Sequence, residues 1–445
     1  MIKWIKIFLT GVLVSMFFFP FEFTFLPTVN TKMAMAVVGL GILLVYLVRQ
    51  GDLSIPKELL VLLFLAGSVS LISLFTMVYN RTPDAAYVTY IVSASVWLSS
   101  AFVVCVTIRG VHGRLDVPLI IYYFTAVCVF QCIIALVIDY NIAVQQFVDR
   151  WIVGGEFYHE IKRLYGIGAG LDIAGTRFSC DLIAIAFLLS RREGRLSWKN
   201  TLLLFVAFVV VSVIGNMIAR TTLVGMALGI VLLAISATRL INDTLNSGVG
   251  KLMVISFFVA LVAVPAVIFF YNSDQQFQEL MRFGFEGFFS LAETGEWHVS
   301  SNDMLEGMIV WPDDIETWII GDGYFQSQRW DPNYVGDAPI YEAGYYMGTD
   351  VGYCRFIFYF GVIGLIAIST VITYAALTCS NAFGDYKVMF LIVLLAGFIM
   401  WWKSSTDIFL FFAVFVCCSF LNSGEDEEEE ESQEPVAVRR GFYRI

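Results

Sequence analysis

The chain has 445 residues, of which 58% are hydrophobic and only 15% are charged. A soluble domain could not bury that much apolar surface, so the composition excludes an ordinary water-soluble protein and predicts that most of the chain lies in lipid. The net charge of -11 comes from two places: residues 272–349 contain 14 acidic and 2 basic residues, and the tail from Glu425 contains 8 acidic and 3 basic ones. Nothing in this distribution favours a nucleic-acid partner.

Apolar segments of spanning length recur along the chain. A helix needs roughly 20 apolar residues to cross a hydrocarbon core of about 30 Å, so these segments predict an all-α polytopic membrane protein with about twelve transmembrane helices. The last two segments are separated at Lys403–Asp407, where polar residues would be costly in mid-bilayer. The expected spans are 7–26, 33–48, 58–79, 86–108, 117–138, 171–190, 200–218, 221–238, 252–271, 351–378, 387–402 and 406–421.

Basic residues in the short loops set the expected orientation. They gather on one side of the predicted bundle, which is therefore expected to be cytoplasmic; they are Arg109, Arg114, Arg191, Arg192, Arg195, Lys199, Arg239 and Lys251. With an even number of spans, both termini lie on that side and the long acidic loop lies outside. The predicted organisation is helices 1–9 in residues 1–271, a large periplasmic loop in 272–349, helices 10–12 in 350–421, and a disordered acidic cytoplasmic tail in 422–445.

Two outer loops remain between these spans. The smaller, 139–170, contains an amphipathic stretch from Ile142 to Ile152 that predicts a helix lying along the membrane interface. In the larger loop, 275–305 has helix-like patterning, whereas 313–348 is rich in Gly, Pro, Asp and Tyr and predicts irregular structure. A loop of that length is unusual unless it has a function.

Four arginines at the outer membrane boundary are candidate ligands for an anion: Arg220, Arg163, Arg177 and Arg355. A guanidinium at a membrane boundary is costly unless it meets water or an anion. Arg220 stands in a very short turn at the N-terminus of the next helix, where its charge and the unpaired N–H groups favour a ligand such as a diphosphate. Arg163 and Arg177 flank a glycine-rich segment, where bare backbone can approach a ligand.

Structural roles for the same residues stay open at this stage. An interfacial arginine can extend to lipid headgroups or pair with a carboxylate, and Arg177 with Asp181 has the spacing of such a pair. Asp350, at the end of the large loop beside Tyr353 and Arg355, fits both a general base and a helix N-cap. Lys403, one helical turn before Asp407, is the weakest cationic candidate.

The large loop combines carboxylates with many aromatic residues, among them Tyr324 and Trp330. Aromatic faces stack on sugar rings and carboxylates accept hydrogen bonds from hydroxyl groups, so the mixture predicts binding of a neutral glycan. Near the spans, the alternative is an interfacial aromatic belt. We expect no metal site, because His159 and His298 lack ligand spacing and the pair Asp313–Asp314 is more typical of a solvated turn.

Several short motifs follow one another in a recognisable order. They are Arg163-Leu-Tyr-Gly166, the outer turn with Arg220, Ile319-Ile-Gly321-Asp-Gly323-Tyr-Phe, and Gly348-Thr-Asp350-Val-Gly-Tyr353 running into Phe360-Gly361-Val-Ile-Gly364-Leu. Over residues 160–420 their order and spacing resemble the O-antigen polymerase and O-antigen ligase superfamily, integral membrane glycosyltransferases that assemble bacterial surface polysaccharides.

The resemblance implies a GT-C-like protein of the bacterial inner membrane that transfers glycans without a metal or cofactor. Its donor and acceptor would be undecaprenyl-diphosphate-linked oligosaccharides, and a chain-length regulator would be a further partner. Arg220 and Arg163 would bind the diphosphate and stabilise it as the leaving group. The other candidate substrate contacts come from the residue patterns described above and are Arg177, Arg355, Tyr353, Tyr324 and Trp330. The ligases commonly carry a histidine before the Gly-Leu-Ile-Gly-like span, and Asp350 lies in that neighbourhood here.

This difference favours a Wzy-type polymerase of O-antigen, capsule or exopolysaccharide over a ligase that acts on lipid A core or protein. A flippase or other transporter of lipid-linked oligosaccharides is the alternative from another class. It would need a polar path through the bilayer, whereas the charged residues gather at the outer boundary and few lie in mid-span.

Overall fold

The computed structural model describes residues 2–50, 56–161, 163–191, 196–241, 248–328 and 345–433. About 79% is helical, which confirms the expected all-α architecture. The elements in chain order are α1 (Ile2–Phe18), β1 (Glu22–Phe23), β2 (Leu26–Asn30), α2 (Thr31–Gln50), α3 (Lys57–Asn80), α4 (Tyr90–His112), α5 (Val117–Tyr140), α6 (Ile142–Trp151), α7 (Gly155–Glu160), α8 (Leu171–Ser190), α9 (Trp198–Ile218), α10 (Thr222–Ile241), α11 (Gly248–Ser273), α12 (Gln275–Gly284), α13 (Glu286–Thr294), α14 (Ser300–Met308), α15 (Ile315–Ile319), η2 (Tyr346–Gly348), α16 (Gly352–Ala382), η3 (Gly384–Tyr386), α17 (Lys387–Met400) and α18 (Phe409–Gln433).

Seven of the described helices are long and apolar enough to cross a membrane: α3, α4, α5, α8, α9, α11 from Val254, and α16. Shorter apolar stretches occur in α2, α10 and α18. Length and composition thus give a multi-pass helical protein, while a total of twelve spans stays a prediction.

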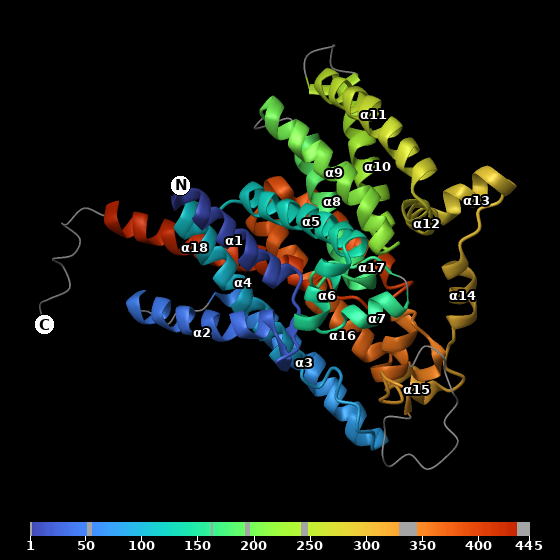
Figure 1. The fold of residues 1–445 in the computed structure, drawn as a ribbon. Coiled ribbons are helices and arrows are strands. Elements are labelled where there is room, and N and C mark those ends of the chain that lie inside the picture. The colour runs from blue at the N-terminus through green and yellow to red at the C-terminus, as the bar shows by residue number, and fades with distance from the viewer. Residues whose placement is uncertain are drawn as a thin grey trace, which may run out of the picture.

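Helix α8 lies at the centre of the bundle (Figure 1), where it packs against α9, α10 and α17. Its most apolar window is 83% buried inside the protein, whereas only 6% of the corresponding window of α11 is buried. Helix α11 therefore presents its apolar side chains outward, as expected of a helix that faces lipid. The buried helix α8 is the one whose N-terminal end follows the glycine-rich segment 163–170.

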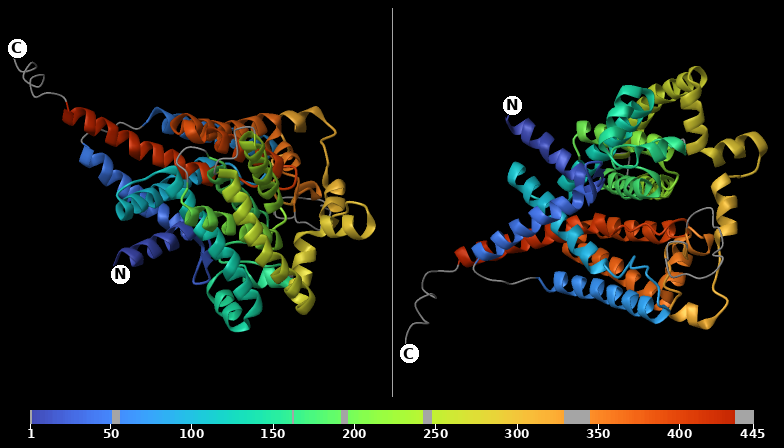
Figure 2. Two further views of the ribbon diagram at one scale, coloured as in Figure 1. Left: turned by 90° about the horizontal axis from the view of Figure 1, so that it is seen from above. Right: turned by 60° about the horizontal axis from the view of Figure 1, so that its bottom comes forward.

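The long loop lies at one end of the bundle. Figures 1 and 2 show α12 to α15 together at this end, while the start of α1 and the end of α18 lie at the opposite end. Helices α12, α13 and α14 match the helix-like patterning of residues 275–305, and most of the remaining described loop is irregular, as expected. Helix α6 likewise forms the amphipathic helix expected in the smaller loop.

The first expected span, 7–26, is wrong at its C-terminal end. Helix α1 stops at Phe18, and the chain then forms the antiparallel hairpin of β1 and β2. Pro20 and Pro27 explain the difference, because proline cannot donate a backbone hydrogen bond inside a helix. At the other end of the chain, α18 continues as helix to Gln433, although the acidic tail was expected to be disordered from residue 422; residues 434–445 lie outside the described residues.

Two of the sequence motifs meet in space and fasten the loop to the bundle. Helix α16 is broken at Phe360 and Gly361, and the backbone N–H groups of Asp322 and Gly323 donate to carbonyls freed there. Gly361 has φ +66, and a Cβ at this position would collide with the carbonyl oxygen of Ile319. The contact therefore requires glycine. It places residues 322–323 of the large loop against the middle of the first half of α16.

Candidate functional site

Arg220 lies in the short turn between α9 and α10, as the sequence predicts, but it is bound by the large loop. Its Nε donates to the carbonyl oxygen of Phe283 at 3.0 Å and its Nη1 to the Ser301 hydroxyl at 3.1 Å. Its Nη2 forms an ion pair with Glu286 at 2.8 Å. The Arg220 side chain is 15% exposed, so the guanidinium sits at the edge of the protein interior.

Arg163 reaches the same place from the glycine-rich segment. The guanidinium carbons of Arg163 and Arg220 lie 3.9 and 4.1 Å from the centre of one aromatic ring, that of Phe283. Burial, followed by the charge of Arg220, lowers the pKa of Arg163. The two guanidinium groups lie over the same ring and repel each other. An anion bound between them would relieve this repulsion, so the arrangement attracts anions.

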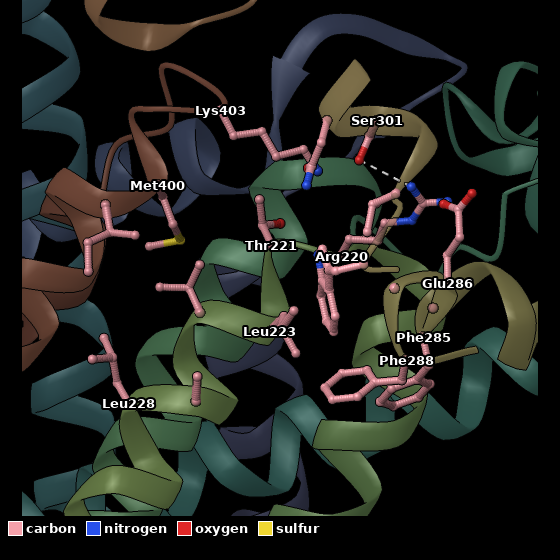
Figure 3. A pocket seen from close by; sticks show the side chains of 18 residues that line it. Arg220, Thr221, Leu223, Leu228, Phe285, Glu286, Phe288, Ser301, Met400 and Lys403 are labelled. Atoms are coloured by element: carbon pink, nitrogen blue, oxygen red, sulfur yellow. Dashed lines mark hydrogen bonds and ion pairs between the residues drawn. The ribbon is translucent and has the colours of Figure 1, made fainter. Parts of the chain in front are cut away.

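A cavity of about 400 Å³ opens beside Arg220. One wall comes from α10 and α17 and is apolar, whereas Arg220, Ser301 and Lys403 gather at one end (Figure 3). Figure 3 also shows Phe285 and Phe288 from the loop helices lying toward the apolar end. The cavity therefore combines a charged end, where Glu286 accompanies the two cations, with an apolar wall.

Lys403, the weakest cationic candidate in the sequence, lines the cavity beside Arg220. Its Nζ pairs with Asp172 of α8 at 3.2 Å, and the expected neighbour Asp407 instead accepts hydrogen bonds from the Tyr90 hydroxyl and the Phe409 backbone N–H. The partner is on another helix because the turn between α17 and α18 directs Lys403 toward the start of α8. Lys403 thereby becomes the second cation of the cavity.

Asp350 and Arg355 form an ion pair at 3.5 Å. The buried guanidinium of Arg355 lies 3.7 Å from the ring centre of Phe325 and 4.0 Å from that of Tyr345. Burial raises the pKa of Asp350 to about 6, although the positive charge of Arg355 opposes the shift. The N-cap of α16 is Val351. The capping role considered for Asp350 is therefore wrong.

Electrostatic interactions connect these groups. The charges of Asp172 and Lys403 act on Asp350, and Asp172 also acts on Arg163. Asp350, Lys403, Asp172, Arg163 and Arg220 thus form one charged cluster at the loop end of the bundle. We call it the outer cluster.

The remaining predicted residues have other surroundings. The Tyr353 hydroxyl donates to the carbonyl oxygen of Phe398, so it fastens α16 to α17. Tyr324 stacks on Tyr346, with ring centres 5.4 Å apart. Trp330 lies outside the described residues.

Arg177 does not join the outer cluster. It lines a separate cavity beside the β1–β2 hairpin. Among the described residues it has no ion pair with Asp181, which instead accepts a hydrogen bond from Thr125. The i, i+4 pair considered for Arg177 and Asp181 is therefore not formed, because α8 directs Asp181 toward α5.

The described residues contain no group of three or more His, Cys, Asp or Glu side chains arranged to hold a metal. His298 pairs with Asp303 at 2.8 Å and His159 contacts Gln145. All eight cysteines lie in the described part of the chain, where each is buried and free.

Three members of the site were not predicted from the sequence: Glu286, Phe283 and Asp172. Glu286 is one of many acidic residues in the loop, and no local pattern distinguishes it. Phe283 resembles any other apolar residue of an amphipathic helix. Asp172 alone carried a signal, because it is a carboxylate inside the glycine-rich segment that Arg163 and Arg177 flank.

No protein-family model, curated protein or solved structure matches this chain.

Proposed function

We propose that this protein is a membrane glycosyltransferase that polymerises undecaprenyl-diphosphate-linked oligosaccharide repeat units into O-antigen, capsule or exopolysaccharide. The observation that carries the proposal is the cavity beside Arg220, which has Arg220 and Lys403 at one end and an apolar wall along α10 and α17. A polyprenyl diphosphate has the complementary design, since a doubly charged head is attached to a long apolar chain.

The diphosphate would bind where Glu286 now meets Arg220. In this structure Arg220 donates to a carboxylate, a carbonyl oxygen and a hydroxyl oxygen, and the anionic oxygens of a phosphate could replace the carboxylate. Arg163, whose guanidinium also lies over the Phe283 ring, adds a second positive charge. Together these cations would stabilise the charge that develops on the departing diphosphate.

Asp350 would serve as the general base. The acceptor hydroxyl oxygen bonds to the anomeric carbon of the donor sugar, the bond from that carbon to the diphosphate oxygen breaks, and the hydroxyl proton moves to the Asp350 carboxylate. A pKa of about 6 leaves Asp350 ionised at neutral pH yet basic enough to accept the proton. Its partner Arg355 holds the carboxylate in place.

The loop supplies a surface suited to sugars. Tyr324 with Tyr346, and Trp311 with Trp318, form stacked aromatic pairs beside carboxylates such as Asp322. Apolar ring faces and acceptor oxygens favour polyhydroxylated ligands over polyanions.

A GT-C-like arrangement of twelve spans completes the proposal, with the loop periplasmic and both termini on the cytoplasmic side of the inner membrane. The placement of α12–α15 at the end opposite to the start of α1 and the end of α18 supports this orientation (Figure 2). The bilayer and a chain-length regulator would be the further partners.

The decisive experiment uses purified protein and lipid-linked repeat units alone, followed by gel separation of the products. We expect a ladder of glycan lengths together with released undecaprenyl diphosphate. A reaction that starts only when lipid A core or a protein acceptor is added would identify a ligase. Movement of the lipid-linked unit across vesicles without any glycan transfer would identify a transporter and refute the enzymatic proposal.

A further inference from the structure

A second cavity, of about 450 Å³, lies apart from the one beside Arg220, and the two share no lining residue. Its walls come from the β1–β2 hairpin, the α6–α7 segment, the glycine-rich segment 166–170 and the first turns of α2 and α8. This volume is within the range of roughly 300–1,000 Å³ that is typical of small-molecule sites. We call it the hairpin cavity.

Two cations, Lys32 and Arg177, line the hairpin cavity. Lys32, from the first turn of α2, has its Nζ 4.8 Å from the ring centre of Trp97, and Arg177 has its guanidinium carbon 5.5 Å from that of Phe19. Within the described residues, neither side chain forms an ion pair or donates a hydrogen bond. Both side chains are partly buried, so water satisfies them only in part.

The charges of Lys32 and Arg177 repel each other, because they are close enough to interact. Two carboxylates lie around these cations, but among the described residues neither forms an ion pair with Lys32 or Arg177. Glu22 lines the cavity, but its Oε2 accepts the backbone N–H of Thr28 within the hairpin. Asp407 attracts Lys32, but its two oxygens accept hydrogen bonds from Tyr90 and Phe409. Two partly buried, unpaired cations are costly unless an anion joins them.

Other groups around the cavity suit a phosphate. Tyr158 lines it together with Arg177, whose charge acts on the Tyr158 hydroxyl. The backbone of Gly166, Gly168 and Gly170 forms part of the wall. A tyrosine hydroxyl, a lysine and an arginine together supply the hydrogen-bond donors that phosphate oxygens accept.

We propose that the hairpin cavity is a second phosphate-binding site, in which Lys32 and Arg177 hold one phosphate or diphosphate group. The site does not depend on the proposed polymerase activity, because it is built from other residues than the outer cluster. The phosphate belongs either to a soluble anion or to a lipid headgroup, and both would present the same oxygens to the two cations.

The test measures how fast an amine-acylating reagent modifies Lys32 in the full-length protein, by mass spectrometry of the peptide that contains Lys32. Inorganic diphosphate is the soluble probe, and a polyprenyl diphosphate in lipid nanodiscs is the membrane probe. We expect at least one probe to slow the modification of Lys32 fivefold or more. Protection by inorganic diphosphate identifies a site for soluble anions, and protection by the lipid alone identifies a headgroup site.

Matched variants separate this site from the outer cluster. Arg177→Gln should abolish the protection and Arg177→Lys should retain part of it, which guards against a result caused by misfolding. Arg150→Gln is the control, because Arg150 is an exposed neighbour that does not line the cavity. In this variant the probe should protect Lys32 as it does in the wild-type protein. Arg220→Ala should also leave the protection intact.

Three results would overturn the proposal. They are no protection of wild-type Lys32 by either probe, undiminished protection in Arg177→Gln, and loss of protection in Arg220→Ala equal to that in Arg177→Gln. The last result would mean that one continuous site includes both cavities. The polymerisation assay is independent of all three, so a failure of the proposed activity and a failure of this site can be told apart.

Discussion

Replacing Glu286 with glutamine asks whether Arg220 binds substrate or only fastens the loop. The substitution keeps the size of the side chain and removes the charge that now pairs with Arg220 at 2.8 Å. If Arg220 is the diphosphate ligand, Glu286 competes with substrate for it, and Glu286→Gln should strengthen binding. If Arg220 only fastens the loop, losing the ion pair should weaken the structure and the activity together.

The magnitude follows from the exposure of the pair. Two unit charges about 4 Å apart interact by about 4 kcal/mol at an effective dielectric constant of about 20. Exposed fractions of 15% for Arg220 and 28% for Glu286 leave enough water to offset most of that energy, so the net contribution is about 1 kcal/mol. Since about 1.4 kcal/mol corresponds to a factor of ten, we expect Glu286→Gln to lower KM for the lipid-linked unit about fivefold.

Arg220→Ala provides the opposite perturbation. Removing one preorganised donor to a developing oxyanion typically costs about 10²- to 10³-fold in kcat. We therefore expect Arg220→Ala to reduce polymerisation by this factor while the melting temperature falls by only a few degrees. The two substitutions should move the kinetics in opposite directions and the stability in the same direction.

The assay is the initial rate of ladder formation against the concentration of lipid-linked repeat unit, with thermal unfolding measured in the same detergent. Glu293→Gln is the matched control, because Glu293 pairs with Arg282 on the same loop, where both side chains are about half exposed. It should change neither kinetic constant. An unchanged or raised KM in Glu286→Gln, or equal losses of activity in Glu286→Gln and Arg220→Ala, would refute the reasoning.

Three further predictions follow from the same structure. The Asp350 carboxylate must be ionised to accept a proton, so kcat/KM should rise with pH and level off above about 6, and Asp350→Asn should give a low rate without this dependence, as a pH profile would show. Gly361→Ala should lower the free energy of unfolding by at least about 1–2 kcal/mol, because φ is +66 there and the new Cβ would meet the Ile319 carbonyl, whereas Gly384→Ala, which faces open space, should unfold like wild type in the same denaturant titration. Lys403→Met should raise KM about tenfold in the rate assay, because one charge-assisted contact with an anion is worth about 1.5–3 kcal/mol; an unchanged KM would remove Lys403 from the site.

The amino-acid sequence by itself determined the class of protein and most of its helices. Apolar segments of bilayer length leave no alternative to helices, because every backbone polar group in lipid must be satisfied within its own segment. The end of the first segment was wrong, because Pro20 ends the helix inside a continuous apolar stretch, and the helix α18 extends further into the acidic tail than expected. The position of Arg220 in the short turn between α9 and α10 was also predictable, since it depends on residues that are close in the chain.

The tertiary structure alone decided which charges meet. Glu286 reaches Arg220, Asp172 reaches Lys403, and Arg177 turns away from the outer cluster toward Lys32. Side-chain periodicity specifies the face of a helix that is apolar, but it does not specify the neighbour toward which a polar residue on that face points. These partners lie on separate elements, and only the packing of α8 against its neighbours and the docking of the loop onto the broken helix α16 bring them together.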